Sequence, residues 1–369
     1  MIALRKKCLM VMGALLTIVC SQAMSSRDLQ GGQKQQVPVI RNPKKTIAKE
    51  LIKISKDLVI GSNKDGAEDF FEELQSVLAD DKGNIYVLDG RAEIVKVFDS
   101  SGKLISTVGK KGQGPGEYER PSGMQFTSNK ELLIRSIGRL SYFTLDGKYL
   151  RQFSKMTWDV SPIPDRKGRF IGLSFSPTTE RGVFNNQLMI FSEDYSPLKE
   201  IAGYKGQMRA DTEMQPIFPK RILYAMLKNG NIVWGINQSY VLNITDEEGS
   251  LLRQFTREYD PIAISDEEKK ATLARMNRLA PGGNWEFPEN YPPMYNIITD
   301  DENHIIIQTY EHFRSPYRKY EIFSVDGKYV ADFVLKNNLA YWKNNKIYCI
   351  TETGEGIPQL ERYSVIWGK

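Results

Sequence analysis

The stretch QSVLADDKGNIYVLDGRAEIVKVFDSSGKLISTVGKKGQGPGEYERPSG, residues Gln75–Gly123, contains one four-strand unit and the start of the next. Its strand-like segments are Ser76–Ala79, Ile85–Leu88, Ile94–Phe98 and Leu104–Val108. DDKGN joins the first segment to the second, and DSSGK joins the third to the fourth. Both are typical of tight turns, because Asp accepts hydrogen bonds from nearby backbone N–H groups and Gly tolerates positive φ. Four antiparallel strands in about 40 residues cannot bury both of their faces alone. The stretch therefore predicts one blade of a β-propeller.

The same unit recurs along the chain. Further copies cover Gly123–Phe153, Trp158–Ile201, Arg221–Phe255 and Tyr295–Leu335, and a sixth copy begins at Leu339. The sixth copy has room for only three strands, and the alternating segment Ala48–Ile60 has no other partner. We therefore predict an all-β fold over residues 48–369, a six-bladed β-propeller of four-stranded antiparallel blades, closed by this N-terminal strand in the last blade. Five or seven blades remain alternatives, because long loops stretch the third and fifth copies.

One segment interrupts the repeat between the fourth and fifth copies. Ser265 is a typical helix N-cap followed by acidic residues, and apolar side chains recur at Leu273, Met276 and Leu279. This pattern predicts a short amphipathic helix, followed by an irregular loop that ends at Pro293. The insertion covers residues 264–293.

The N-terminus has the pattern of an export signal. Met1–Ala23 combines a basic start, an apolar core and a small-residue cleavage site, which is typical of a Sec signal peptide. We expect a periplasmic or secreted protein, and Cys20 leaves open the alternative of a lipid anchor at the outer membrane. Residues 24–47 are polar and predict a flexible tether.

Charge and cysteine content exclude several classes of protein. Removing the signal peptide lowers the formal net charge from +5 to +2, which argues against nucleic acid as a partner. No later stretch reaches the roughly 18 apolar residues that a transmembrane segment needs. Cys349 alone remains beyond the signal peptide, so we predict no internal disulfide and no cysteine metal site, and expect a buried thiol. We expect the protein to be a monomer.

The run GQGPGEY, Gly112–Tyr118, is not a phosphate loop, because it lacks the Lys-Ser/Thr pair of such loops. Its glycines predict a turn between blades, with Tyr118 and Pro121 packing at the junction. DDKGN and DDENH have too few ligand positions for calcium loops and predict β-turns. His304 and His312 are expected at opposite ends of one strand, where they cannot share a metal.

The segments DDKGNIYVLD and VKVFDSSGKLISTVGKKGQGPGEYERPSGM, together with the helix ISDEEKK, also carry a resemblance. They resemble the NHL-type repeat and, more closely, a bacterial group of exported six-bladed β-propeller proteins of unknown function. The resemblance covers the chain from Glu50 to its C-terminus. It implies the fold and export, and it implies no agreed catalytic set.

Loop lengths distinguish the two faces of the predicted disc. Tight turns join the first strand to the second and the third to the fourth, so they share one face. The longer second-to-third connections and the crossings between blades share the other, which we call the crossing-loop face, where binding residues are expected. The predicted binding residues are Asp89, Arg91, Arg135, Arg139, Arg181, Tyr310, His312, Arg314 and Glu352. Converging arginines would favour a carboxylate, a sulfate or a sugar acid, although each Arg could instead pair with a loop acid or face solvent.

No catalytic Ser/His/Asp or Cys/His set is visible, and we predict no cofactor and no metal site. The sequence favours a non-catalytic propeller of the cell envelope that binds a carbohydrate, a peptide or an envelope protein. Trp285, Phe287 and Tyr291 in the insertion could stack on a sugar ring or hold the loop onto the propeller. The alternative is a metal-dependent lactonase- or lyase-like propeller enzyme, with Asp89 and Glu352 as candidate ligands.

Overall fold

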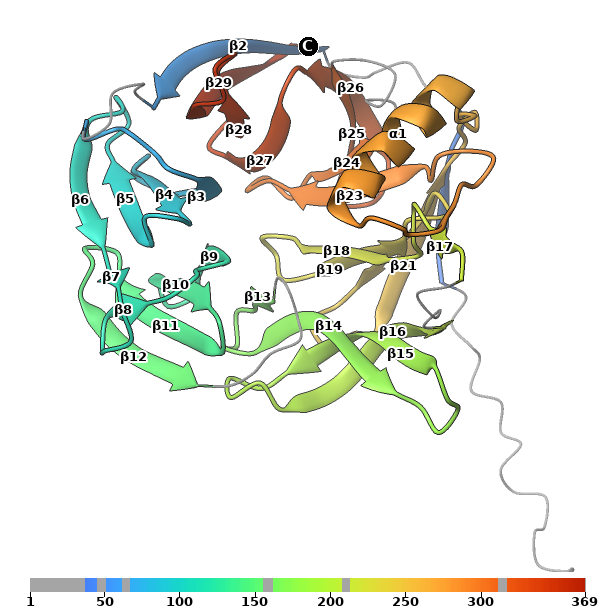
Figure 1. Cartoon of the computed structure of the whole chain (residues 1–369), viewed down its shortest axis with the longest axis horizontal. Helices are drawn as coiled ribbons and strands as arrows, with labels where there is room; N and C mark the ends of the chain where they lie inside the picture. Colours follow the sequence, from blue (N-terminus) through green and yellow to red (C-terminus); the bar gives the residue numbers. More distant parts are fainter. Residues whose placement is uncertain are drawn as a thin grey trace, which may run out of the picture. The chain divides into compact units, whose positions relative to one another are not determined.

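The computed structural model describes residues 37–44, 51–61, 67–154, 162–207, 213–310 and 317–368. From Val37 onwards the chain forms a six-bladed β-propeller, with the blades arranged in a ring (Figure 1). The fold predicted from the repeats is confirmed. The predicted signal peptide, with Cys20, lies outside the described residues, as do the parts of the predicted tether before residue 37 and over residues 45–47.

The first three blades are each built from four consecutive antiparallel strands. The first contains β3 (Leu74–Ala79), β4 (Ile85–Asp89), β5 (Ile94–Phe98) and β6 (Leu104–Val108). The second contains β9 (Gly123–Phe126), β10 (Glu131–Ser136), β11 (Arg139–Thr144) and β12 (Tyr149–Ser154). The third contains β13 (Ile163–Pro164), β14 (Phe170–Pro177), β15 (Val183–Phe191) and β16 (Pro197–Gln207).

The last three blades follow the same plan with two additions from the N-terminus. The fourth contains β18 (Ile222–Met226), β19 (Ile232–Ile236), β20 (Val241–Thr245) and β21 (Leu251–Arg257), joined by β1 (Val39–Asn42). The fifth contains β23 (Met294–Thr299), β24 (Ile305–Thr309), β25 (Arg318–Phe323) and β26 (Tyr329–Leu335). The sixth contains β27 (Asn338–Lys343), β28 (Lys346–Glu352) and β29 (Pro358–Gly368), completed by β2 (Leu51–Ile60).

The ring closes through β2, which pairs antiparallel with β29 from Leu51 opposite Gly368 to Ile60 opposite Leu360. The first and last parts of the propeller therefore share one sheet, and the last blade has no exposed edge at this position. Closure by an N-terminal strand, as the three-strand sixth copy predicted, is what the structure contains.

The structure differs from the predicted tether over Val39–Asn42. This segment forms β1, a parallel fifth strand on the outer edge of the fourth blade. The buried Asn42 side chain explains why it is ordered: its amide donates to the carbonyls of Thr256 and Gly327, and its oxygen accepts from the backbone N–H of Tyr329. A polar composition suggested a tether, but buried amides find full hydrogen bonding here.

The hydrophobic core lies between blades. Six clusters of buried apolar side chains in the described part of the chain each join two neighbouring blades around the ring. At the first junction, Tyr86 meets Phe126 edge to face with ring centroids 5.2 Å apart. Every residue of β4 is buried, as its continuous apolar run predicts. Each blade therefore depends on both neighbours for burial of its faces.

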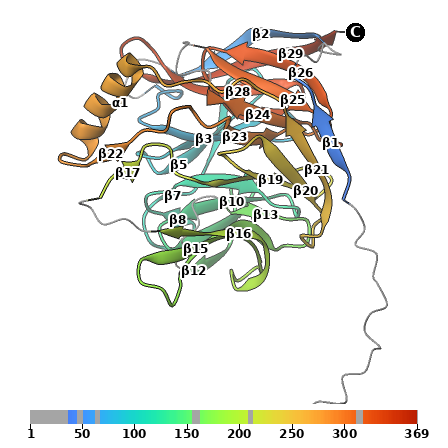
Figure 2. The same ribbon diagram turned by 90° about the vertical axis from the view of Figure 1, so that its right-hand side faces the viewer.

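Several short elements lie on one side of the propeller. The crossing between the first two blades pairs β7 (Lys110–Lys111) with β8 (Glu117–Tyr118), and the insertion pairs β22 (Trp285–Glu286) with β17 (Gln215–Pro216). The predicted helix is α1 (Asp266–Leu279), and Ser265 and Glu268 form a reciprocal capping box at its start. In Figure 2, α1, β17 and β22 lie together on one side of the propeller. None of the helix residues is fully buried, so the predicted apolar stripe is covered only in part.

Candidate functional site

On the face that carries the tight turns, the aspartate carboxylates of DDKGN and DDENH accept hydrogen bonds within their own turns. In DDKGN, the Asp80 carboxylate accepts from the backbone N–H groups of Lys82 and Asn84 at 2.9 and 2.8 Å. In DDENH, Asp300 accepts in the same way from Glu302 and His304. The β-turns predicted for both segments are confirmed, because these carboxylates are used inside their own turns.

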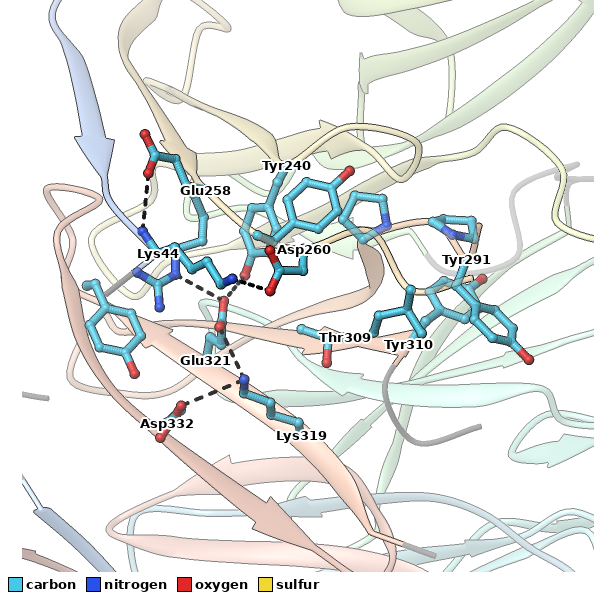
Figure 3. Close-up of a pocket in the computed structure, with 16 residues that line it drawn as sticks. Lys44, Tyr240, Glu258, Asp260, Tyr291, Thr309, Tyr310, Lys319, Glu321 and Asp332 are labelled. Carbon is cyan, nitrogen blue, oxygen red and sulfur yellow. Dashed lines mark hydrogen bonds and ion pairs between the residues drawn. The ribbon is translucent and has the colours of Figure 1, made fainter. Parts of the chain in front are cut away.

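In the described part of the chain, the crossing-loop face holds at least four pockets, each walled by second-to-third connections or by blade crossings. The one drawn in Figure 3 lies between the fourth and fifth blades and has a cavity volume of about 320 Å³. Its lining includes five tyrosines, Tyr240, Tyr259, Tyr291, Tyr310 and Tyr329, so we call it the tyrosine pocket. A mixture of aromatic rings with a few charged groups is typical of small-ligand sites.

A charged network, buried at Tyr240, Arg257 and Glu321, forms one wall of the tyrosine pocket. The Tyr240 hydroxyl donates to Glu321 Oε2 at 2.6 Å, and Arg257 Nε lies 3.7 Å from the same oxygen. Lys319 Nζ lies 3.8 Å from Glu321 Oε1 and 3.9 Å from an oxygen of Asp332, as Figure 3 shows. Burial, followed by the Glu321 carboxylate, raises the pKa of Tyr240 well above its ordinary value, so Tyr240 remains a hydroxyl donor.

The N-terminal segment supplies another part of the lining of the tyrosine pocket. Lys44, just after β1, forms an ion pair with Asp260, and its backbone N–H donates to Glu258 Oε2 at 3.4 Å. Glu258 in turn donates its backbone N–H to the carbonyl of Asn42 at 3.0 Å. The lining of the tyrosine pocket therefore depends on β1 being in place.

Aromatic packing holds the insertion onto the propeller. Tyr291 stacks on Tyr310 with ring centroids 5.9 Å apart, and Phe218 contacts both rings at 5.3 Å. Tyr291 is buried and Phe287 packs against this cluster, so both help to hold the loop in place. Trp285 lies in β22 with its ring against Gly283. Tyr259 is more exposed to solvent than these aromatic residues, with 40% of its surface accessible.

A second pocket of about 540 Å³ adjoins the tyrosine pocket and shares Tyr259, Tyr291, Pro292 and Pro293 with it. Its other walls come from the crossing between the third and fourth blades, from the segment after β21 and from the insertion, and include Pro216, Pro261 and Pro288. Tyr259 therefore stands between two adjoining hollows. Prolines give such walls little conformational freedom to lose when a ligand binds.

The predicted binding residues are distributed over several places. Arg91 and Glu352 line one pocket of about 540 Å³ between the first and sixth blades, and neither side chain has a polar partner among the described residues. Arg139 lines a different pocket, between the first and second blades, and donates to the carbonyl of Gln113 at 2.9 Å. The structure thus brings Arg91 and Glu352 together and places Arg139 elsewhere.

The remaining predicted residues have separate environments. Arg135 donates to the hydroxyl and the carbonyl of Ser122, at 2.9 and 3.0 Å, and helps to hold the blade crossing. Arg181 is exposed at the end of the hairpin formed by β14 and β15. Tyr310 is buried in the wall of the tyrosine pocket. His312 and Arg314 lie outside the described residues.

The two candidate metal ligands do not fit a metal centre. Asp89 is buried, and its carboxylate accepts from the backbone N–H groups of Glu72, Glu73 and Ala92 at 2.8, 3.0 and 3.1 Å. Glu352 is exposed at the edge of its pocket. Over the described ranges, no group of three or more His, Cys, Asp or Glu side chains is placed to hold a metal ion.

Sequence reasoning missed most of the tyrosine pocket. Glu321 carried a detectable signal, since it is a carboxylate between Tyr320 and Ile322 in the buried half of β25 and such a group needs a partner. Tyr240 and Tyr259 lie at the predicted crossing-loop face, but nothing local distinguishes them from other loop tyrosines. Their proximity depends on how the fourth and fifth blades pack.

Comparisons with known proteins agree with the fold. Residues 68–221 match the family DUF5128, described as a 6-bladed beta-propeller. No curated protein matches the chain. No helix in the described part of the chain is long and apolar enough to cross a membrane.

Three solved structures are similar to this chain over most of its length. A candidate exported protein from Bacteroides fragilis is similar at 10% identity and a TM-score of 0.55, with 90% of this chain and 100% of that chain covered. A member of the DUF4221 family from Bacteroides vulgatus is similar at 10% identity and a TM-score of 0.52, with 87% and 99% covered. A virginiamycin B lyase from Staphylococcus aureus has 8% identity and a TM-score of 0.42, with 86% and 100% covered. For the first two, the likeness at 10% identity concerns the fold alone.

Proposed function

We propose that this propeller is a non-catalytic binding protein of the cell envelope and that it holds a carbohydrate in the tyrosine pocket of its crossing-loop face. Of the three predicted partner classes, carbohydrate agrees best with the chemistry of this pocket. The export signal in Met1–Ala23 supports a place outside the cytoplasm, as a periplasmic or secreted monomer or through a lipid at Cys20.

The observation that carries the proposal is the exposed ring of Tyr259 beside a pocket with a partly buried network of charges. The C–H face of a sugar packs against an open aromatic ring, and its hydroxyls exchange hydrogen bonds with carboxylates and cations. Tyr240, Glu321 and Lys319 provide a hydroxyl, a carboxylate and an ammonium within one wall. Their mutual hydrogen bonds and ion pairs hold them in position before a ligand arrives, which limits the entropy lost on binding.

A glycan array and calorimetry on the full chain test the proposal, with Tyr259→Ala as the informative variant. We expect wild type to bind at least one glycan and Tyr259→Ala to bind it at least tenfold more weakly, a loss of about 1.4 kcal/mol. Tyr259→Phe should retain most of the affinity, because it keeps the ring.

The matched control is Phe175→Ala, which removes a similarly exposed ring, at 47%, from the third blade. Equal losses in Tyr259→Ala and Phe175→Ala, or no glycan binding by wild type, would contradict the proposal. A stoichiometric divalent ion in the purified protein, whose removal by a chelator abolishes ligand binding, would instead support the lactonase- or lyase-like alternative.

A further inference from the structure

Another pocket of the crossing-loop face lies between the first and second blades and is lined mainly by charged side chains. Its volume is about 510 Å³, and its lining includes Glu93, Lys111, Arg120, Ser136 and Arg139. We infer that this pocket, which we call the blade 1–2 pocket, binds a hydroxylated carboxylate of the sugar-acid class. The inference concerns different residues from the tyrosine pocket and does not rest on the proposed function.

Glu93 presents a buried carboxylate oxygen that its surroundings do not satisfy. The residue is only 7% exposed, and its Oε1 accepts from the backbone N–H of Arg120 at 2.9 Å. Its Oε2 is buried and receives no hydrogen bond from any described residue. The nearest cation, Lys111 Nζ, lies 3.7 Å away, beyond hydrogen-bond distance. A buried carboxylate oxygen in this position favours a ligand that brings a donor.

Ser136 adds a second buried polar atom to the same wall. It lies at the end of β10 and is 5% exposed, and its hydroxyl has no hydrogen-bond partner in the described part of the chain. A serine hydroxyl can both donate and accept, so it complements a ligand hydroxyl in either direction. Glu93 and Ser136 therefore offer two sites to a ligand with several hydroxyl groups.

The rim of the blade 1–2 pocket is basic. The Arg120 guanidinium makes no hydrogen bond or ion pair with any described residue, and Lys111 has only the long contact to Glu93. Arg139 uses Nη1 on the carbonyl of Gln113 and keeps its other N–H groups for a ligand. These three cations can pair with a carboxylate, and arginine can do so through two parallel hydrogen bonds.

The charge balance favours a hydroxy acid over a zwitterion. The lining carries three cations and two carboxylates, Glu93 and Glu119, and Glu119 is already held by the side-chain amide of Gln113 at 3.1 and 3.2 Å. Three cations and two carboxylates leave one net positive charge, which a ligand with one negative charge neutralises. An amino acid is a zwitterion without net charge, so it would not neutralise this positive charge. Ile137, 65% exposed at the same rim, offers an apolar surface to the C–H face of a sugar ring.

Isothermal titration calorimetry on the full chain tests the inference with D-glucuronate and D-galacturonate as probes. We expect at least one of them to bind, and expect D-glucose, which lacks the carboxylate, and acetate, which lacks the hydroxyls, to bind at least tenfold more weakly. Arg120→Ala and Ser136→Ala should each weaken uronate binding, Arg120→Ala by at least tenfold. Added salt should weaken it further, because the rim is open to solvent.

Glu93→Gln completes the series, since Gln can still accept from the Arg120 N–H but loses the anionic oxygen. If this variant fails to fold, which circular dichroism would reveal, Arg120→Ala still decides the question because that side chain is exposed. The matched control is Arg91→Ala, which removes an exposed arginine from another pocket of the same face and should leave uronate binding unchanged.

Three results would overturn the inference: no binding of either uronate, glucose binding as tight as uronate binding, or full affinity in Arg120→Ala. The test also separates the two pockets. Tyr259→Ala should retain uronate binding even if it loses the glycan of the tyrosine pocket, so failure of one proposal is distinguishable from failure of the other.

Discussion

Gly109 shows how a single residue determines the route from the first blade to the second. It has φ of +68°, and a Cβ at this position would lie 2.2 Å from the Tyr118 ring. Tyr118 is fully buried, donates its hydroxyl to the Val108 carbonyl at 2.7 Å and packs edge to face on Phe143. The packing role predicted for Tyr118 is confirmed, and it requires a glycine beside it.

We expect Gly109→Ala to destabilise the protein by at least about 3 kcal/mol, combining the cost of a left-handed alanine with overpacking against Tyr118. Gly138→Ala is the matched control, because Gly138 has φ of +66° and open space around its missing Cβ. It should cost only about 1 kcal/mol. Urea denaturation of the two variants measures the difference, and equal losses would show that Tyr118 does not restrict this position.

His304 and Cys349 are two reactive residue types used for packing. His304 Nδ1 lies 2.7 Å from Asp300 Oδ2, and its ring packs against Trp367 with centroids 5.0 Å apart. Cys349 is fully buried, and burial, followed by the Glu361 charge, raises the pKa of its thiol to about 12. The buried thiol predicted from its apolar strand is confirmed, and so low a thiolate population makes it unreactive.

At the scale of elements, β2 is held to the last blade by more than backbone pairing. Asp57 interrupts the register at a bulge between Lys56 and Leu58, and its carboxylate accepts from Lys346, Ser364 and Arg362, the last at 2.8 Å. Burial acts to raise the pKa of Asp57, but these hydrogen bonds and the Arg362 charge outweigh it and hold the pKa below its ordinary value. The ionised carboxylate is therefore part of the closure.

We expect the closure to weaken in acid. A carboxyl whose pKa is lower in the folded state stabilises the fold above its unfolded pKa, and the contribution disappears as the pH falls below about 4 and through the folded value. Asp57→Asn should lose about 1 kcal/mol at pH 7 and show a weaker dependence on pH below about 4. Thermal unfolding at a series of pH values measures this, with the exposed Glu355→Gln as control; identical pH profiles for wild type and Asp57→Asn would contradict it.

At the scale of the whole molecule, the propeller is a closed ring in which every blade shares a core cluster with each neighbour. Opening the ring at one junction exposes two apolar faces at once. This coupling favours unfolding in one cooperative step rather than blade by blade. The N-terminal residues take part in it twice, through β1 on the fourth blade and β2 on the sixth.

Three truncations separate these contributions. A chain that starts at Val37 keeps both strands and should melt like the full chain, because the compact unit begins there. A chain that starts at Leu51 loses β1 with the Asn42 hydrogen bonds and should melt several degrees lower. A chain that starts at Gly61 loses β2 as well and should not show a cooperative transition. Calorimetry measures all three, and a cooperative transition without β2 would show that the ring does not need this strand.

Local sequence predicted those features that need only nearby residues. The turns at Asp80 and Asp300, the capping box at Ser265 and the buried run of β4 all depend on neighbours within a few positions. The strand β2 was predictable for a different reason, since a sixth copy with three strands leaves one place in the ring unfilled. The strand β1 was not predictable, because the hydrogen-bond partners of the Asn42 side chain belong to the fourth and fifth blades, far from Asn42 in the sequence.

The candidate sites show the same division. The face was predictable from loop length, but the residues that meet on it were not, because Arg257 and Glu321, or Glu93 and Ser136, belong to different blades and become neighbours only when these pack. The amino-acid sequence by itself determined the repeating strand unit and favoured six blades closed by an N-terminal strand, since hydrophobic periodicity and turn chemistry act over short distances. Only the tertiary structure decided which charged and aromatic side chains share a pocket, because the distance between two side chains on neighbouring blades depends on packing that no local pattern encodes.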